Sequence, residues 1–242
     1  MSLYRSFADL IEDNRAHLAS DEVRHLVRVR RFSQGDLFEA TDGKGRRCVC
    51  RLEKDAAGWF GEVVEEIESD PESPFRTVLA QALLKKDRFE WVLQKATELG
   101  VAEIVPIVTQ RTEVRLDARR EANKLARWRR ILIEAVKQCG RSRIPELAAP
   151  IELAEFVAAP LEFPLWMLDE EGGESLAKAS RSLPGLSGAV VLVGPEGGWD
   201  AEDRRLLNGI PAVSVSLGPR ILRAETAPIV VLSILQHLYG DL

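Results

Sequence analysis

The sequence is poor in cysteine and histidine. Its 242 residues include three cysteines (Cys48, Cys50 and Cys139) and three histidines. This odd and sparse set argues against a disulfide framework. Cys48 and Cys50 lie two residues apart on an expected strand, so their side chains share a face, but no second pair or suitably spaced histidine completes a metal site. We therefore expect buried core thiols and no metal.

Long apolar runs and the commonest catalytic motifs are also missing. No apolar stretch approaches the roughly 18–20 residues that span a bilayer, and the N-terminus lacks the apolar segment of a signal peptide. The sequence contains no HExxH, GxSxG, Walker loop or GxGxxG, which argues against the commonest hydrolases, NTPases and dinucleotide enzymes. We expect a soluble, cytoplasmic protein with no membrane partner.

Charge of one sign does not dominate. The 33 Lys and Arg residues against 38 Asp and Glu give a net charge of −5, which excludes a uniformly basic coat. Positive charge is concentrated locally, because residues 111–143 hold eleven Lys and Arg against four acidic residues. A second basic cluster lies in the N-terminal part, at Arg24, His25, Arg28, Arg30 and Arg31. The two clusters fit two interpretations about equally well: they are solvent-exposed helix faces, or they form a binding surface for a polyanion.

The first 70 residues have the pattern of a small β-rich module. A hairpin is predicted around the turn Asp42–Gly45, followed by one more strand. The expected strands cover residues 37–41, 46–52 and 59–67, and a short helix covers 20–31 with Val23, Leu26 and Val27 facing inward. The acidic segment 68–74 contains Ser and Pro and is predicted to be an unstructured boundary.

After this boundary, strands and helices alternate, which predicts an α/β domain with a parallel sheet. Asp87 and Glu90 fit a capping box for a helix that ends at Leu99. Asp200 and Asp203 fit the same role for a later, short helix. The other expected helices cover residues 122–139 and 226–239, and the expected strands cover 77–84, 101–108, 165–168, 189–193 and 213–217.

Two strand ends in this domain carry unusual loops. The first is Val193-Gly194-Pro195-Glu196-Gly197-Gly198-Trp199-Asp200, and the second runs from Ser216 to Pro228 and mixes glycine with Arg, Glu and Thr. Glycine lets a backbone turn sharply and approach a ligand closely. Ligands of open α/β sheets bind outside the carboxyl ends of strands. Both loops are therefore predicted to form a binding site.

The residues of these loops resemble the cofactor-binding signature of the SPOUT class of methyltransferases. More narrowly, nearly the whole chain resembles the RsmE family of 16S ribosomal RNA uridine-N3 methyltransferases. Gln110-Arg111-Thr112 departs mildly from the family's usual Arg-Ser at that loop. The resemblance is carried by the segments 25–31, 95–101, 194–198 and 217–227, together with Gly35-Asp36, Gln138, Arg141 and Pro145.

The resemblance implies an architecture, a cofactor and partners. Residues 1–70 are expected to form a PUA-like β-barrel that binds RNA, and residues 71–242 a SPOUT α/β domain with a trefoil knot around the cofactor site. The implied cofactor is S-adenosyl-L-methionine, and the implied substrate is a uridine of 16S ribosomal RNA in the small ribosomal subunit. The resemblance also implies a homodimer.

The candidate site residues fall into three groups. Arg223 is expected to act as a cation near the base, and Glu225 and Glu196 are the candidate proton acceptors, although Glu225 could instead complement the dipole of the last helix. The RNA-binding candidates are Arg24, Arg28, Arg30, Arg31, Arg111 and Arg141. The cofactor-binding candidates are Leu168, Val193, Gly194, Pro195, Glu196, Gly197, Leu217, Gly218, Ile221, Leu222, Arg223, Thr226 and Ala227.

Two alternative functions stay open at this point. One is a SPOUT enzyme that acts on another RNA base or on a ribose 2′-hydroxyl, and the other is a non-catalytic RNA-binding protein with a relict pocket. The last helix also allows two interpretations, because it is apolar nearly all round: a partner subunit could cover it, or it could be fully internal.

Overall fold

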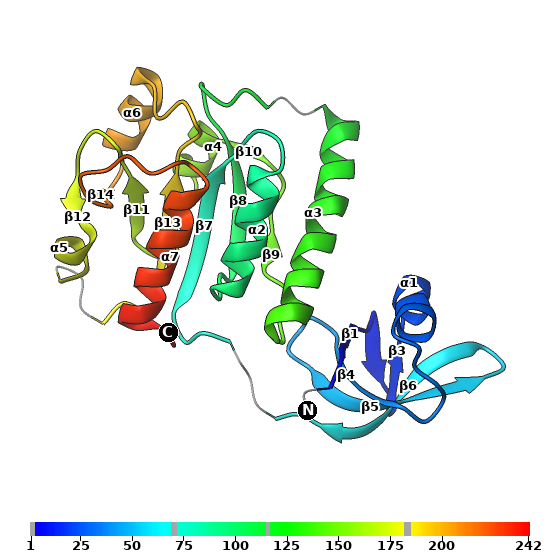
Figure 1. Cartoon of the computed structure of the whole chain (residues 1–242). Helices are drawn as coiled ribbons and strands as arrows, with labels where there is room; N and C mark the ends of the chain where they lie inside the picture. The colour runs from blue at the N-terminus through cyan, green and yellow to red at the C-terminus, as the bar shows by residue number, and fades with distance from the viewer. Residues whose placement is uncertain (1–2, 69–71, 115–116, 182–184) are drawn as a thin grey trace. The chain divides into compact units, whose positions relative to one another are not determined.

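The computed structural model describes residues 3–68, 72–114, 117–181 and 185–242. The chain forms two compact units (Figure 1). One unit contains residues 1–72 and 133–144, and the other contains residues 73–132 and 145–242. Within the described ranges, no helix is both long enough and apolar enough to cross a membrane.

The N-terminal unit is built on a six-stranded sheet with the order β1-β4-β5-β6-β3-β2. The predicted hairpin is confirmed, because β4 and β5 pair antiparallel with Phe38 opposite Cys50. The expected helix divides into α1 (Ser20–Arg24) and a π-helical turn, η1 (His25–Val29). The strands are β1 (Arg5–Phe7), β2 (Leu10–Glu12), β3 (Arg15–His17), β4 (Leu37–Thr41), β5 (Arg47–Asp55) and β6 (Gly58–Glu66).

One apolar core fills this unit. Cys48 and Cys50 both lie in it, fully buried beside Phe38 and Leu52, with their sulfur atoms 3.4 Å apart. The prediction of buried core thiols is confirmed for this pair, whereas Cys139 is only partly buried. The described residues contain no group of three or more His, Cys, Asp or Glu side chains placed to bind a metal.

Buried charges tie the end of a later helix into the N-terminal unit. Glu22 is buried and accepts hydrogen bonds from Ser6 Oγ (2.5 Å) and from Lys137 Nζ (2.6 Å). Glu72 pairs with Arg141 (2.5 Å) and also accepts from the backbone N–H of Ser142 (3.0 Å). The expected linker 68–74 thus includes a residue with a defined role, although residues 69–71 lie outside the described ranges.

The second unit contains the predicted parallel sheet. Its order is β10-β8-β7-β13-β11-β14-β12, with β9 paired to β8, and every pairing is parallel. The strands β11 and β13 fall on the predicted segments nearly residue for residue. The strands are β7 (Arg76–Ala82), β8 (Glu103–Val108), β9 (Glu146–Leu147), β10 (Ile151–Glu152), β11 (Leu165–Leu168), β12 (Glu174–Ser175), β13 (Gly188–Val193) and β14 (Ala212–Ser216).

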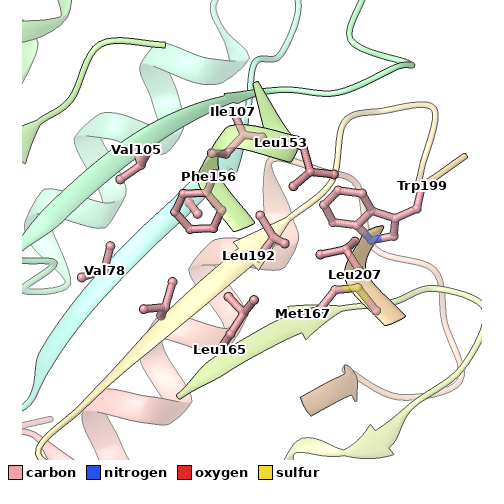
Figure 2. Packing of buried hydrophobic residues seen from close by; sticks show 12 residues of the cluster. Val78, Val105, Ile107, Leu153, Phe156, Leu165, Met167, Leu192, Trp199 and Leu207 are labelled. Carbon is pink, nitrogen blue, oxygen red and sulfur yellow. The ribbon is translucent and has the colours of Figure 1, made fainter. Parts of the chain in front are cut away.

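Helices cover both faces of this sheet (Figure 1). Helix α7 packs against α2 and lies over β7 and β13, and α4 packs against α6. The strand residues that meet α4 and α6 alternate along each strand, as a pleated strand requires (Figure 2). The helices are α2 (Arg88–Glu98), α3 (Ala118–Cys139), α4 (Leu153–Ala158), α5 (Leu176–Arg181), α6 (Ala201–Asn208) and α7 (Thr226–Tyr239).

The predicted helix caps have different outcomes. Asp200 and Asp203 form the expected capping box of α6, with Asp203 N–H donating to Asp200 Oδ1 at 2.8 Å. The capping box at Asp87 is wrong, because the Asp87 side chain makes no cap hydrogen bond. Its proposed partner Glu90 instead pairs with Arg127 of α3 at 2.7 Å. The Glu90 carboxylate therefore forms an ion pair with a distant helix instead of the predicted cap of α2.

Candidate active site

A cavity of about 600 Å³ lies at the carboxyl ends of three adjacent strands. The strand β11 is the middle one, with β13 and β14 on either side. The loops after β13 and β14 therefore face each other across the end of β11 rather than following directly adjacent strands. The volume falls within the roughly 300–1,000 Å³ that is typical of small-molecule sites.

The glycine-rich loop 194–198 forms one wall, and several neighbours hold it. The buried ring of Trp199 packs beneath Gly194, and its indole N–H donates to Leu168 O at 2.9 Å. Arg111 donates from its guanidinium to Gly197 O at 2.6 Å. Gly198 has a φ of +67°, in the left-handed region that favours glycine. These contacts fix the course of the loop.

Glu196 also helps to hold this loop in place. Its Oε1 accepts the backbone N–H of Lys85 (3.0 Å) and a guanidinium N–H of Arg88 (3.2 Å). Both donors come from the segment that leads into α2, about a hundred residues earlier in the chain. The Glu196 carboxylate is therefore already engaged by two hydrogen bonds.

The loop 217–225 forms the opposite wall and is far more open. Ile221 has 80% of its surface exposed, and the Arg223 side chain is 79% exposed. Gly218 has a φ of +110° and no heavy atom within 4 Å of the position that a Cβ would occupy. A side chain at Gly218 would enter open space next to the cavity. The apolar and cationic side chains of this wall are therefore exposed.

Glu225 lines the cavity at the start of α7 and is largely buried, with 15% of its side chain exposed. Its Oε1 lies 3.6 Å from Arg88 Nε and 3.9 Å from Arg223 Nη1. Its Oε2 is buried and has no hydrogen-bond partner in the described part of the chain. A buried carboxylate oxygen without a donor is costly, so this atom is poised to accept a hydrogen bond or a proton.

The end of β11 adds acidic groups that the motifs did not indicate. Asp169 and Glu170 line the cavity, and Asp169 pairs with Arg204 of α6 at 2.8 Å. This hydrogen bond raises the pKa of Arg204. With Glu196 and Glu225, these residues place four carboxylates around the cavity. Because Arg88, Arg220 and Arg223 also line it, the cavity offers both hydrogen-bond acceptors and cationic donors to a ligand.

The structure gathers almost all of the predicted catalytic and cofactor-binding residues around the cavity. Of these candidates, Thr226 alone is absent from the lining. Arg88 could not be predicted as a site residue, because nothing in its local motif places α2 beside loops more than a hundred residues later. Asp169, Glu170 and Val215 also line the cavity outside the two predicted loops, whereas Gly198, Ser216, Pro219, Arg220 and Ala224 belong to those loops.

The N-terminal arginine candidates share one surface feature. Arg24, Arg28, Arg30 and Arg31 are all exposed, on or directly after α1 and η1. None of them forms an ion pair with the described residues. The Arg30 guanidinium lies over the Tyr4 ring at 4.4 Å, and the His25 ring stacks on the same residue. This combination of exposed cations and aromatic faces suits contacts with RNA.

The other two RNA-binding candidates have different roles. Arg111 is exposed, but it donates to the glycine-rich loop as described above. Arg141 is only 6% exposed, and its guanidinium pairs with Glu72. The placement of Arg141 therefore contradicts a direct contact with RNA, because a buried, paired guanidinium cannot reach a phosphate. Arg115, which belongs to the basic segment 111–143, lies outside the described residues.

Comparisons with known proteins agree with this geometry. Residues 71–236 match the sequence model of a family described as an RNA methyltransferase domain, and residues 18–56 match an RNA methyltransferase PUA domain. The chain is 31% identical to the ribosomal RNA small subunit methyltransferase E of Bacillus subtilis (strain 168), over 93% of this chain and 92% of the relative.

Solved structures resemble the whole chain. A putative methyltransferase from Legionella pneumophila, in complex with the bound cofactor SAM, has 34% identity and a TM-score of 0.92 over 100% of both chains. The ribosomal RNA small subunit methyltransferase E from Neisseria gonorrhoeae, bound to S-adenosyl methionine, has 33% identity and a TM-score of 0.89 over 99% of both. With these matches, the chain belongs to the ribosomal RNA small subunit methyltransferase E family.

Proposed function

We propose that this chain transfers a methyl group from S-adenosylmethionine to N3 of a uridine in 16S ribosomal RNA. The family supports the methyltransferase activity and the ribosomal RNA substrate. The single observation that carries the chemistry concerns Glu225, which lines the cavity and whose buried Oε2 has no hydrogen-bond partner among the described residues. N3 of uridine bears a proton that must leave as the new bond forms, and this oxygen can accept it.

The residues around the cavity fit the proposed cofactor. Leu217 and Leu222 form an apolar wall for an adenine ring. Gly218 lies between them without a side chain, so the space beside it stays open for the ligand. The carboxylates of Asp169 and Glu170 suit ribose hydroxyls. When bound, S-adenosylmethionine supplies a methyl group that is already activated by a sulfonium. The protein itself then has to remove the N3 proton and stabilise the charge that develops on the uracil.

Glu225 is the better of the two candidate proton acceptors. Both carboxylates line the cavity, but a proton on the Glu196 carboxylate would weaken the two hydrogen bonds that its Oε1 accepts and that hold its loop. Glu225 Oε2 has no donor in the described chain, so it can take the N3 proton without breaking an existing bond. We therefore assign Glu225 as the general base and Glu196 as a residue that fixes the glycine-rich loop.

Arg223 is the proposed electrophilic group. Its guanidinium is exposed at the rim of the cavity and lies within 3.9 Å of Glu225. As N3 loses its proton, negative charge grows on the uracil carbonyl oxygens, and a nearby guanidinium stabilises that charge. Because the interaction strengthens toward the transition state, it increases the rate rather than the affinity for the ground state.

The partners belong to the same proposal. The exposed arginines of residues 24–31 would bind the RNA backbone, and the N-terminal 1–70 region would thus orient the substrate for the 71–242 region in the cytoplasm. We also propose that the chain forms a homodimer. The trefoil knot around the cofactor site, which the resemblance implies, is part of the same proposal. Helix α7 supports a partner surface, because Ile229, Val230 and Ile234 are only partly buried and Leu238 is 46% exposed.

Mapping the methylated nucleotide tests this function directly. RNA from cells that lack the gene, and from cells that regain it, is digested and analysed for 3-methyluridine by mass spectrometry. A 16S uridine that loses and regains the N3 methyl group supports the proposal. A change at another base or at a ribose would favour the alternative SPOUT activity, and no calorimetric binding of S-adenosylmethionine would favour the relict.

A further inference from the structure

We propose that Arg88 is a positioning residue, which acts on methyl transfer through Glu225. Arg88 is the first residue of α2, and it reaches carboxylates on both walls of the cavity. Its Nη1 donates to Glu196 Oε1 at 3.2 Å, and its Nε lies 3.6 Å from Glu225 Oε1. The inference rests on the proposed function, because it needs Glu225 to accept the proton.

The geometry divides the two oxygens of Glu225 between two tasks. Oε1 faces the guanidinium of Arg88, whereas Oε2 is buried and has no donor within the described ranges. A carboxylate with one oxygen held by a cation keeps its other oxygen in a fixed direction. The ion pair with Arg88 therefore defines where the accepting oxygen points, as catalysis by positioning requires.

The surroundings make Arg88 the principal candidate for this role. Arg223 is the other cation near Glu225 among the described residues, but it is farther away, at 3.9 Å, and its side chain is 79% exposed. The Arg88 side chain is 43% exposed and has a second anchor in Glu196, whose loop is held by Lys85. A guanidinium that is braced at one carboxylate orients the second more firmly than a freely exposed one.

Removing this ion pair should misplace the base without emptying the site. For Arg88→Met we expect the single-turnover rate, at saturating RNA and S-adenosylmethionine, to fall about 10²-fold, since small misplacements have effects of this size. The dissociation constant for S-adenosylmethionine should change by less than about threefold. Arg88→Lys should recover part of the rate, because it restores one point charge but not the two-pronged donor.

A double-mutant cycle separates positioning from a general structural role. Once Glu225→Gln has removed the base, adding Arg88→Met should lower the rate less than about threefold further, because the two residues act as one unit. Two independent effects would multiply instead. The matched control is Arg205→Met, which removes an exposed arginine paired with Glu202 on α6 at 2.6 Å, away from the cavity, and should keep the parental rate.

The outcomes are distinct. A multiplicative cycle, or a loss of cofactor affinity as large as the loss of rate, would overturn the role of Arg88. The thermal midpoint and calorimetric binding of each variant show whether the fold and the pocket survive. The parent enzyme tests the proposed function separately: if it methylates no 16S uridine at N3, that function fails, whatever the cycle shows.

Discussion

The two walls of the cavity are built in opposite ways. The loop 194–198 is held by the Trp199 ring, by Arg111 and by the Glu196 hydrogen bonds to Lys85 and Arg88. In the loop 217–225, Ile221 and Arg223 are each about four-fifths exposed. A segment with many internal bonds and a buried anchor opens locally less often than one without them. The first wall is held in place by contacts within the protein, whereas the second wall leaves the side chains of Ile221 and Arg223 exposed.

This difference predicts that substitutions in the first wall chiefly change stability, whereas substitutions in the second chiefly change binding and turnover. The largest expected effect is that of Trp199→Ala, which should lower the free energy of unfolding by about 3–5 kcal/mol, because it empties a buried ring site. Denaturant titration measures it. Trp199→Phe should lower the free energy of unfolding by about 1–2 kcal/mol, because it removes the indole hydrogen bond to Leu168.

The control for this prediction is Trp91→Ala, since Trp91 is 41% exposed on α2. Its effect should be much smaller than that of Trp199→Ala. If Trp199→Ala unfolds at the same denaturant concentration as the parent, the first wall does not depend on its anchor and the contrast between the walls disappears.

The next largest effect concerns the second wall and turnover. Arg223→Ala should lower the single-turnover rate at saturating RNA on the order of 10²–10³-fold, because it removes a cation that stabilises charge in the transition state. The affinity for S-adenosylmethionine should stay within a few-fold, and stability should hardly change, because the side chain is exposed. Arg223→Lys should recover part of the rate. A parental rate for the alanine variant would mean that Arg223 binds a phosphate instead.

A smaller effect is expected at Gly218. Gly218→Val places a branched side chain beside the cavity, so the affinity for S-adenosylmethionine should fall roughly tenfold or more, as overpacking of a filled site does. Gly185→Val is the matched control, because Gly185 also has a positive φ (+75°) and open space around it but does not line the cavity. Equal affinities for the two variants in calorimetry would show that the second wall lies elsewhere.

The basic surface of the N-terminal unit should affect neither wall. Replacing Arg28, Arg30 and Arg31 with Gln should flatten the salt dependence of RNA binding, by roughly 0.7–0.9 in log K per log unit of salt for each phosphate that the protein no longer neutralises. Cofactor affinity should be unchanged. Arg51→Gln serves as the control, because Arg51 is paired with Glu62 in the same unit. An unchanged slope for the triple variant would remove these arginines from the RNA-binding surface.

The smallest expected effect is a pH dependence of stability that is due to Asp203, next to the first wall. Burial raises the pKa of Asp203, which caps α6 directly after the glycine-rich loop. The folded state therefore holds this proton more tightly than the unfolded state, so Asp203 makes the protein more stable as the pH falls from its folded pKa toward its unfolded one. Asp203→Asn should remove that component from the stability–pH curve. An identical curve for both proteins would contradict the assignment.

Local patterns predicted the second unit well because its strands are buried on both faces. Continuous apolar runs such as 165–168 and 189–193 mark such strands clearly, and glycine loops at their ends mark the site. What local patterns could not predict are interactions between distant segments. Glu90 pairs with Arg127 instead of capping a helix, Arg141 is buried against Glu72, and Arg88 reaches Glu225. Each of these depends on which segments the fold brings together.

The division of α3 has a consequence for dissecting the molecule. Residues 133–139 of this helix belong to the N-terminal unit, and they carry the lysine that neutralises Glu22. A fragment cut after Glu72 would keep two acidic groups, Glu22 and Glu72, and lose both of their cationic partners, Lys137 and Arg141. Stranding a buried charge is strongly destabilising. A cleavage after Glu72 therefore leaves the N-terminal unit incomplete, and a fusion that transplants this unit has to carry residues 133–144 as well.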